Sequence, residues 1–218
     1  MGGIIGIDFI NHENPLVEKL DFSFSDYGYK MVVVNTGGSH ADLTEDYASI
    51  PAEMKKVAQY FGKSVCREIT MGQVMNDLKR LTEKVGDRPV LRAMHFLEEN
   101  GRVENQIKAI KENNFAEFLK LVQQSGDSSI KLLQNIYSIK YPSEQKISLA
   151  LAVTEDFMKT HDGGACRIHG GGFAGTILTI LPDHNVKDYQ KCMGRIFGDN
   201  SVIVLGIRSN GIVSLNLS

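Results

Sequence analysis

Gly163–Leu181 reads GGACRIHGGGFAGTILTIL, and this stretch decides the fold class. A glycine pair leads into an apolar segment that ends at Ile168, and the cluster Gly170–Gly172 separates that segment from the β-branched run Thr176–Leu181. β-branched residues bounded by glycines are typical of strands. The stretch therefore predicts two strands joined by a glycine-rich loop.

The glycine cluster has two interpretations. Glycine permits positive φ and a close approach of the backbone to a ligand or to another segment, and successive N–H groups can form a concave anion nest. A bulged turn between strands is the simpler interpretation. The cluster is not a P-loop, because no Gly-Lys-Ser/Thr follows it, and it is not a dinucleotide fingerprint, because that motif must open a helix.

Strands and helices alternate unevenly along the rest of the chain. Apolar runs predict further strands at 3–9, 29–35, 201–206 and 211–217. Helical periodicity predicts helices at 43–61, 71–81, 90–111, 115–124, 144–159 and 186–197. We expect one α+β domain, with a mostly antiparallel sheet of four or five strands and helices on one face.

Three positions in the helical region carry specific predictions. Pro51 predicts a helix start or a kink, because proline removes a backbone donor. Ser125–Ser129 predicts a helix stop followed by a new N-cap before Ile130. Ser143 is predicted to cap the helix that begins at Glu144.

Composition limits the classes of function. The 218 residues include 24 Lys and Arg against 26 Asp and Glu, a net charge of -2 that argues against nucleic-acid or anionic-membrane partners. No run of 18 apolar residues predicts a membrane span, and the N-terminal segment lacks the basic region of a signal peptide. Three cysteines without a CxxC pair (Cys66, Cys166 and Cys192) predict reduced, packed thiols in a cytoplasmic protein.

Three segments resemble the galactokinase branch of the GHMP kinases. Gly164–Thr176 is similar to the third motif of that branch, with its Gly-Gly-Gly-Phe-x-Gly core. Arg92–Val103 resembles the Arg-Ala-x-His…Glu-Asn-x-Arg-Val helix of the family. Val32–Asn35, followed by Glu45–Tyr47, resembles the family's strand and the tyrosine after it. The three segments occur in the family's order and are distributed from Val32 to Thr176 of the chain.

The resemblance implies a fold and an activity. The fold is the ferredoxin-like C-terminal domain of a GHMP kinase, as a single domain over 1–218. The activity of the intact family is Mg²⁺-assisted transfer of the ATP γ-phosphate to the C1 hydroxyl of galactose. The family's sugar motif, Gly-Glu-His-Thr-Asp-Tyr, and its phosphate motif, Gly-Leu-Ser-Ser-Ser, do not occur in the chain, and the family's catalytic Asp precedes the segment that resembles Gly3–Phe9.

The expected partner is therefore an N-terminal galactokinase half, which would bind most of the ATP and Mg²⁺. We expect no catalytic residue and no metal ligand in this chain, and no activity from the chain alone. Two alternatives are a non-catalytic sugar-sensing or sugar-binding module and an N-acetylgalactosamine kinase.

The resemblance also assigns site residues. Tyr47, Gly170, Gly171 and Gly172 are the predicted substrate-binding residues, with a buried helix tyrosine as the alternative role for Tyr47. Phe173 is expected to pack beneath the turn rather than touch the ligand.

Other polar positions are less specific. Ser39 stands where the family has a basic residue near the phosphates, and His169 either orients the loop or replaces a common threonine. Arg92, His95 and Glu99 are interpreted as hydrogen-bonding and ion-pairing residues of a helix, because no metal-ligand spacing accompanies them.

Overall fold

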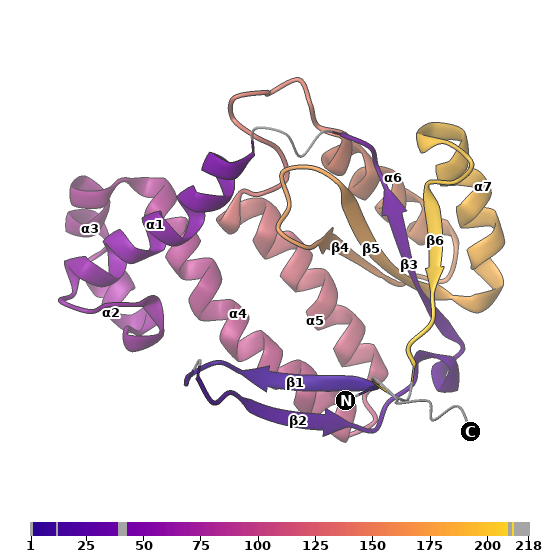
Figure 1. The fold of residues 1–218 in the computed structure, drawn as a ribbon, viewed down its shortest axis with the longest axis horizontal. Helices are drawn as coiled ribbons and strands as arrows, with labels where there is room; N and C mark the ends of the chain where they lie inside the picture. Colours follow the sequence, from indigo (N-terminus) through magenta and orange to yellow (C-terminus); the bar gives the residue numbers. More distant parts are fainter. Residues whose placement is uncertain (1, 12, 39–42, 209–210, 212–218) are drawn as a thin grey trace, which may run out of the picture.

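A computed structural model describes residues 2–11, 13–38, 43–208 and 211. In this part of the chain, a four-stranded sheet, a separate β-hairpin and a set of helices enclose three hydrophobic clusters (Figure 1). The strands are β1 Ile4–Asp8, β2 Leu16–Leu20, β3 Tyr29–Asn35, β4 Ala165–His169, β5 Thr176–Pro182 and β6 Val202–Leu205. The helices are α1 Thr44–Tyr60, α2 Met71–Asn76, α3 Leu78–Val85, α4 Asp87–Lys111, α5 Phe115–Ser128, α6 Lys146–Thr160 and α7 Val186–Phe197.

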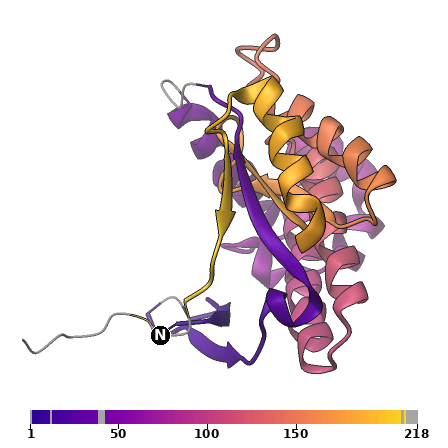
Figure 2. The same cartoon turned by 90° about the vertical axis from the view of Figure 1, so that its right-hand side faces the viewer.

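The sheet has the strand order β4-β5-β3-β6, and every neighbouring pair is antiparallel. Successive side chains of a strand point to opposite faces, so Val32 and Val34 of β3 share one face, and both lie in one core. α6 and α7 close that core on the same face of the sheet, as Figure 2 shows. The predicted α+β class, with a mostly antiparallel sheet and helices packed on one face, is confirmed.

The first predicted strand does not join the sheet. β1 pairs with β2 as a two-stranded hairpin, with Gly6 opposite Glu18. β2 was not predicted, because Glu18 and Lys19 interrupt the apolar pattern of Leu16–Leu20. The strand predicted at 211–217 lies outside the described residues, except for Gly211.

Two helix boundaries differ from the prediction in the first half of the chain. α1 does not start at Pro51 but runs through it from Thr44 to Tyr60. A tertiary contact also fixes the first turn of α1, since Ser138 Oγ donates to Asp46 Oδ2 at 2.7 Å. The helix predicted at 71–81 is two helices, α2 and α3, which meet at Asp77.

The predicted stop at Ser125–Ser129 is wrong. α5 continues to Ser128 and then widens into a π-helical turn, Ser129–Leu133. Gly126 is a packing contact, because a Cβ there would lie 2.7 Å from the main-chain oxygen of Cys166 in β4. Ser143 is not a cap either, since α6 begins at Lys146.

Candidate functional site

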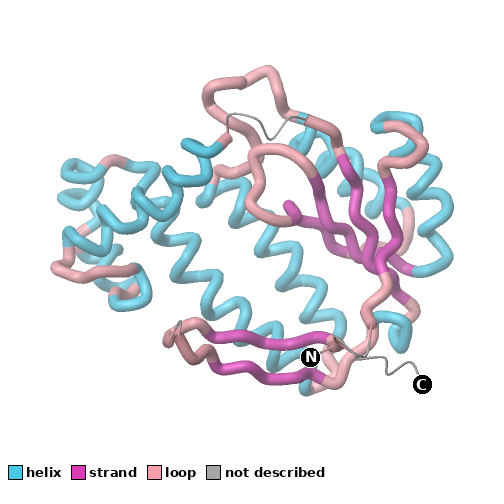
Figure 3. Tube along the Cα trace, in the orientation of Figure 1, coloured by secondary structure: helices cyan, strands magenta, loops and turns pink. Residues whose placement is uncertain are grey.

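The glycine bend, residues 170–172, lies in the loop that joins β4 to β5, one of the loops drawn in pink in Figure 3. Gly170 has φ 78° and Gly172 has φ 86°, a backbone region that L side chains rarely adopt. Gly170 and Gly171 are exposed, whereas Gly172 is buried. The bend therefore offers the main chain of its first two residues to the outside and fixes the third inside.

Tyr47 packs directly on the bend from the first turn of α1. A Cβ on Gly171 would lie 2.6 Å from Tyr47 Cε1, so the ring occupies the space that a side chain would need. The Tyr47 hydroxyl donates a hydrogen bond of 2.9 Å to the main-chain oxygen of Gly172. The structure thus brings together three of the four predicted site residues, and a Cβ on the fourth, Gly170, would meet nothing within 4 Å.

Phe173 lies beneath the bend, as predicted. Its side chain is 6% exposed, and its ring meets the Tyr47 ring edge-on at 5.5 Å. Its φ of 63° is unusual for a side chain of this size. The neighbouring His169 is exposed, and its role stays a prediction.

Asn135 is a residue of the site that the sequence did not reveal. It lies just after the π-helical turn and 36 residues before Gly171 in the sequence. Its Nδ2 donates a hydrogen bond to the main-chain oxygen of Gly171 at 3.0 Å. Its main-chain oxygen accepts a 2.5 Å hydrogen bond from Phe173 N. The only local signal is an asparagine after a break in helical periodicity, which is too common to indicate a site.

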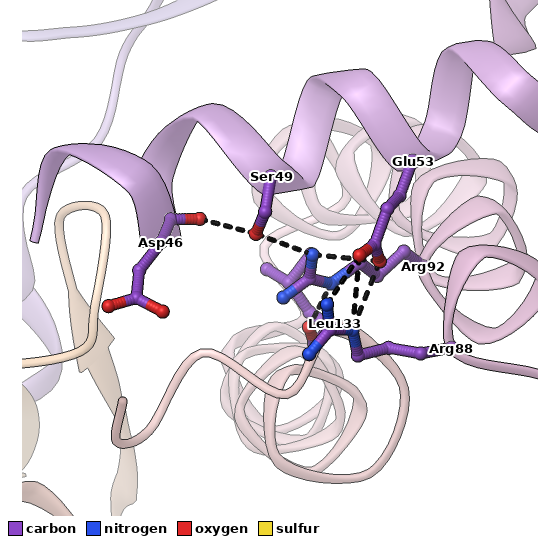
Figure 4. A network of polar contacts seen from close by, with 6 residues as sticks. All are labelled: Asp46, Ser49, Glu53, Arg88, Arg92 and Leu133. Carbon is purple, nitrogen blue, oxygen red and sulfur yellow. Dashed lines mark hydrogen bonds and ion pairs between the residues drawn. The ribbon is translucent and has the colours of Figure 1, made fainter. Parts of the chain in front are cut away.

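An ion-pair network joins α1 to α4 (Figure 4). Arg92, 2% exposed, donates from Nη1 to Glu53 Oε2 at 2.9 Å and to Ser49 Oγ at 2.8 Å. Arg88 completes the network through a 2.5 Å pair with Glu53 Oε1. Burial lowers the pKa of Arg92, whereas the hydrogen bond to Glu53 raises the pKa of Arg88. This part of the family-like helix holds elements together, in agreement with the interpretation of Arg92.

A second polar cluster joins α4 to α5 and β4. His95 Nδ1 lies 2.9 Å from Ser128 Oγ, and Glu99 accepts a 2.5 Å hydrogen bond from Ser125. Arg167 of β4 reaches the same Glu99 carboxylate at 3.5 Å. Burial lowers the pKa of His95, so the imidazole is neutral at physiological pH. Within the described residues, no group of three His, Cys, Asp or Glu side chains could hold a metal ion.

A cavity of about 250 Å³ lies beside the bend. Phe173 and Ala174 form one side of it, the end of β3 at Thr36 another, and the start of α6 a third. Lys146 is the one basic side chain among its described lining residues. Ser39, where the family has a basic residue near the phosphates, lies outside the described residues.

Among the described helices, none has the length and apolar character that a membrane span requires.

Comparison with known proteins gives the family. No protein-family model matches the chain. The chain is 28% identical over 184 residues to the galactokinase of Actinobacillus pleuropneumoniae serotype 5b, a match that covers 84% of this chain and 44% of the relative. It is 30% identical over 179 residues to the galactokinase of Thermosipho africanus, with 80% of this chain and 46% of the relative covered. The chain is a partial member of the galactokinase family, within the GHMP kinase superfamily.

This partial galactokinase spans less than half the length of the curated relatives that it matches. It corresponds to their C-terminal portion. The crystal structure of Lactococcus lactis galactokinase complexed with galactose shares its fold, with a TM-score of 0.66 and 18% identity over 89% of this chain and 48% of that one.

Proposed function

We propose that this chain is the C-terminal half of a galactokinase and that it forms one wall of the active site as a single domain over residues 1–218. The complete enzyme would transfer the ATP γ-phosphate to the C1 hydroxyl of galactose. The observation that carries the proposal is the glycine bend, whose exposed Gly170–Gly171 main chain rests on the half-buried ring of Tyr47 and the buried ring of Phe173. Phosphoryl transfer depends mainly on positioning and electrostatic stabilisation, which a fixed main-chain wall can supply.

The N-terminal half would bind most of the ATP and the Mg²⁺. Mg²⁺ bridges phosphate oxygens and neutralises the charge that develops during transfer. This chain would contribute the main chain of Gly170 and Gly171, which no side chain separates from the substrates. Gly172 would anchor the bend through its oxygen, and Tyr47 would contact the sugar while holding that anchor.

In this proposal, the catalytic and phosphate-binding groups come from the other half of the enzyme. The isolated chain would bind neither ATP nor galactose productively and would have no kinase activity. Its near-neutral charge fits a cytoplasmic sugar kinase without nucleic-acid or membrane partners.

The test combines the chain with an N-terminal galactokinase half that carries the two motifs missing here. ADP release is measured with galactose and MgATP for each half alone and for the mixture. The proposal predicts turnover in the mixture only. Association of the halves without turnover would contradict the enzyme proposal and favour a sugar-sensing module, and faster turnover of N-acetylgalactosamine than of galactose would contradict the assigned substrate.

A further inference from the structure

Two residues with unusual backbone conformations are linked through Asn135 beside the glycine bend. Gln134 ends the π-helical turn with φ 57°, and Phe173 leaves the bend with φ 63°. Non-glycine residues in this region are strained, and such strain persists only where the surroundings impose it. Asn135 joins the two positions, because it follows Gln134 directly and its oxygen accepts the hydrogen bond from Phe173 N at 2.5 Å.

Asn135 holds the bend at three consecutive residues. Its side chain donates to the Gly171 oxygen at 3.0 Å, and its main-chain oxygen binds the N–H of Phe173. At Gly172, which lies between these two residues, a Cβ would lie 2.6 Å from Asn135 Nδ2. Only glycine leaves room for this contact. The side chain of Asn135 is 4% exposed, which removes water as a competitor for these bonds.

The Asn135 amide is only half satisfied. Its Oδ1 is buried and has no hydrogen-bond partner among the described residues. A buried acceptor without a partner costs stability, and an apolar residue at this position would avoid that cost. The benefit of the asparagine therefore lies in its Nδ2, which is the atom that binds the bend.

Arg92 connects this contact to the helix on the other side of the bend. Its Nε donates to the Leu133 oxygen at 3.1 Å, two residues before Asn135, while its Nη1 binds Ser49 and Glu53 of α1. α1 also carries Tyr47. The bend thus lies between Tyr47 on one side and Asn135 on the other, and one guanidinium joins the two supports.

We propose that Asn135 is a positioning residue of the kinase site, which fixes the bend so that the main chain of Gly170 and Gly171 faces the substrates in one conformation. This inference rests on the proposed function. It assigns Asn135 a role in the chemical step without any contact with substrate.

Asn185 provides a matched control. It is also a buried asparagine, 7% exposed, and its Nδ2 donates to a main-chain oxygen, that of His161, at 2.7 Å. That contact lies before β4 begins, whereas the bend follows the end of β4. Asn185→Ala therefore removes a comparable hydrogen bond at a distance from the site.

The experiment compares Asn135→Ala with Asn185→Ala in two measurements. In the chain alone, NMR hydrogen exchange follows the Phe173 amide relative to the amides of β5. In the enzyme assembled with the N-terminal half, kcat and the KM for galactose are measured. We expect Asn135→Ala to accelerate exchange at Phe173 but not across β5, and to lower kcat about tenfold with KM within about twofold, because the lost hydrogen bond fixes the bend that faces the reacting groups in the transition state. Asn185→Ala should change neither.

Equal kcat values for the wild type and Asn135→Ala, or equal losses in both variants, would overturn the proposal. If Asn135→Ala does not fold, Asn135→Ser takes its place, with the same expected direction. Unchanged exchange at Phe173 overturns the proposal even where the assembled wild type shows no turnover. A wild type without turnover, combined with localised acceleration at Phe173, contradicts the proposed function instead.

Discussion

Gly171→Ala tests the contact that shapes the bend. Gly171 does not have a positive φ, so its backbone accepts alanine, and the cost comes from the new methyl group. That methyl would lie 2.6 Å from Tyr47 Cε1 and 3.2 Å from Cδ1, which forces the ring away. The displaced ring costs roughly 1 to 3 kcal/mol through overpacking and about 1 kcal/mol through the weakened Tyr47–Gly172 hydrogen bond. Alanine returns about 0.4 to 1 kcal/mol through the entropy of the unfolded chain.

The net expectation is a loss of roughly 1 to 3 kcal/mol in the free energy of unfolding. Urea denaturation of the chain, followed by circular dichroism, measures it. Gly101→Ala is the control: nothing lies within 4 Å of a Cβ at Gly101 in α4, and alanine should stabilise that helix by about 0.5 to 1 kcal/mol. In a Tyr47→Ala background the ring is absent, so Gly171→Ala should cost nothing. A Gly171→Ala penalty that is the same with and without the Tyr47 ring would refute the reasoning.

Three further predictions concern the supports of the site. Glu53→Ala should lower the free energy of unfolding by about 3 kcal/mol, because it leaves the buried Arg92 guanidinium without its carboxylate; a loss below 1 kcal/mol in urea denaturation would contradict this. His95 has its pKa lowered by burial from the ordinary 6.5, so the unfolded chain binds a proton that the folded chain does not. Stability should therefore be constant above about pH 7 and fall as the pH drops through about 6.5, and the urea midpoints of His95→Gln should show a weaker fall. Gly126→Ala should cost at least about 2 kcal/mol, since its methyl would lie 2.7 Å from the main-chain oxygen of Cys166; a thermal unfolding midpoint equal to that of the wild type would be inconsistent with that contact.

The sheet could be predicted from sequence because its signals are local. Glycines lie next to the β-branched segments of β3 and β5, and runs of such residues bounded by glycines predict strands whichever face the helices cover. The bend was visible for the same reason, since three consecutive glycines between strands indicate a close approach. One of its two supports, Tyr47, was found through the family resemblance rather than through periodicity.

The remaining features depend on residues far apart in the chain. Gly126 looks like a helix terminator, and only the position of Cys166 in space shows that it is a packing contact inside a continuous helix. Asn135 meets Gly171 across 36 residues, after a π-helical turn that no local pattern predicts. Pro51 lies inside α1 despite its low helix propensity, because tertiary packing can override the local preference of a residue.

In the proposed enzyme, Gly170 and Gly171 face a cleft whose opposite wall belongs to another polypeptide half. Amide hydrogen exchange of the peptide that spans the bend tests it, measured for the chain alone and after addition of the N-terminal galactokinase half with galactose and a non-hydrolysable ATP analogue. We expect the exposed amides of the bend to become protected in the assembled sample, while the exposed residues of α7 exchange as before. Unchanged exchange at the bend, in a sample where the two halves are shown to associate, would contradict the account.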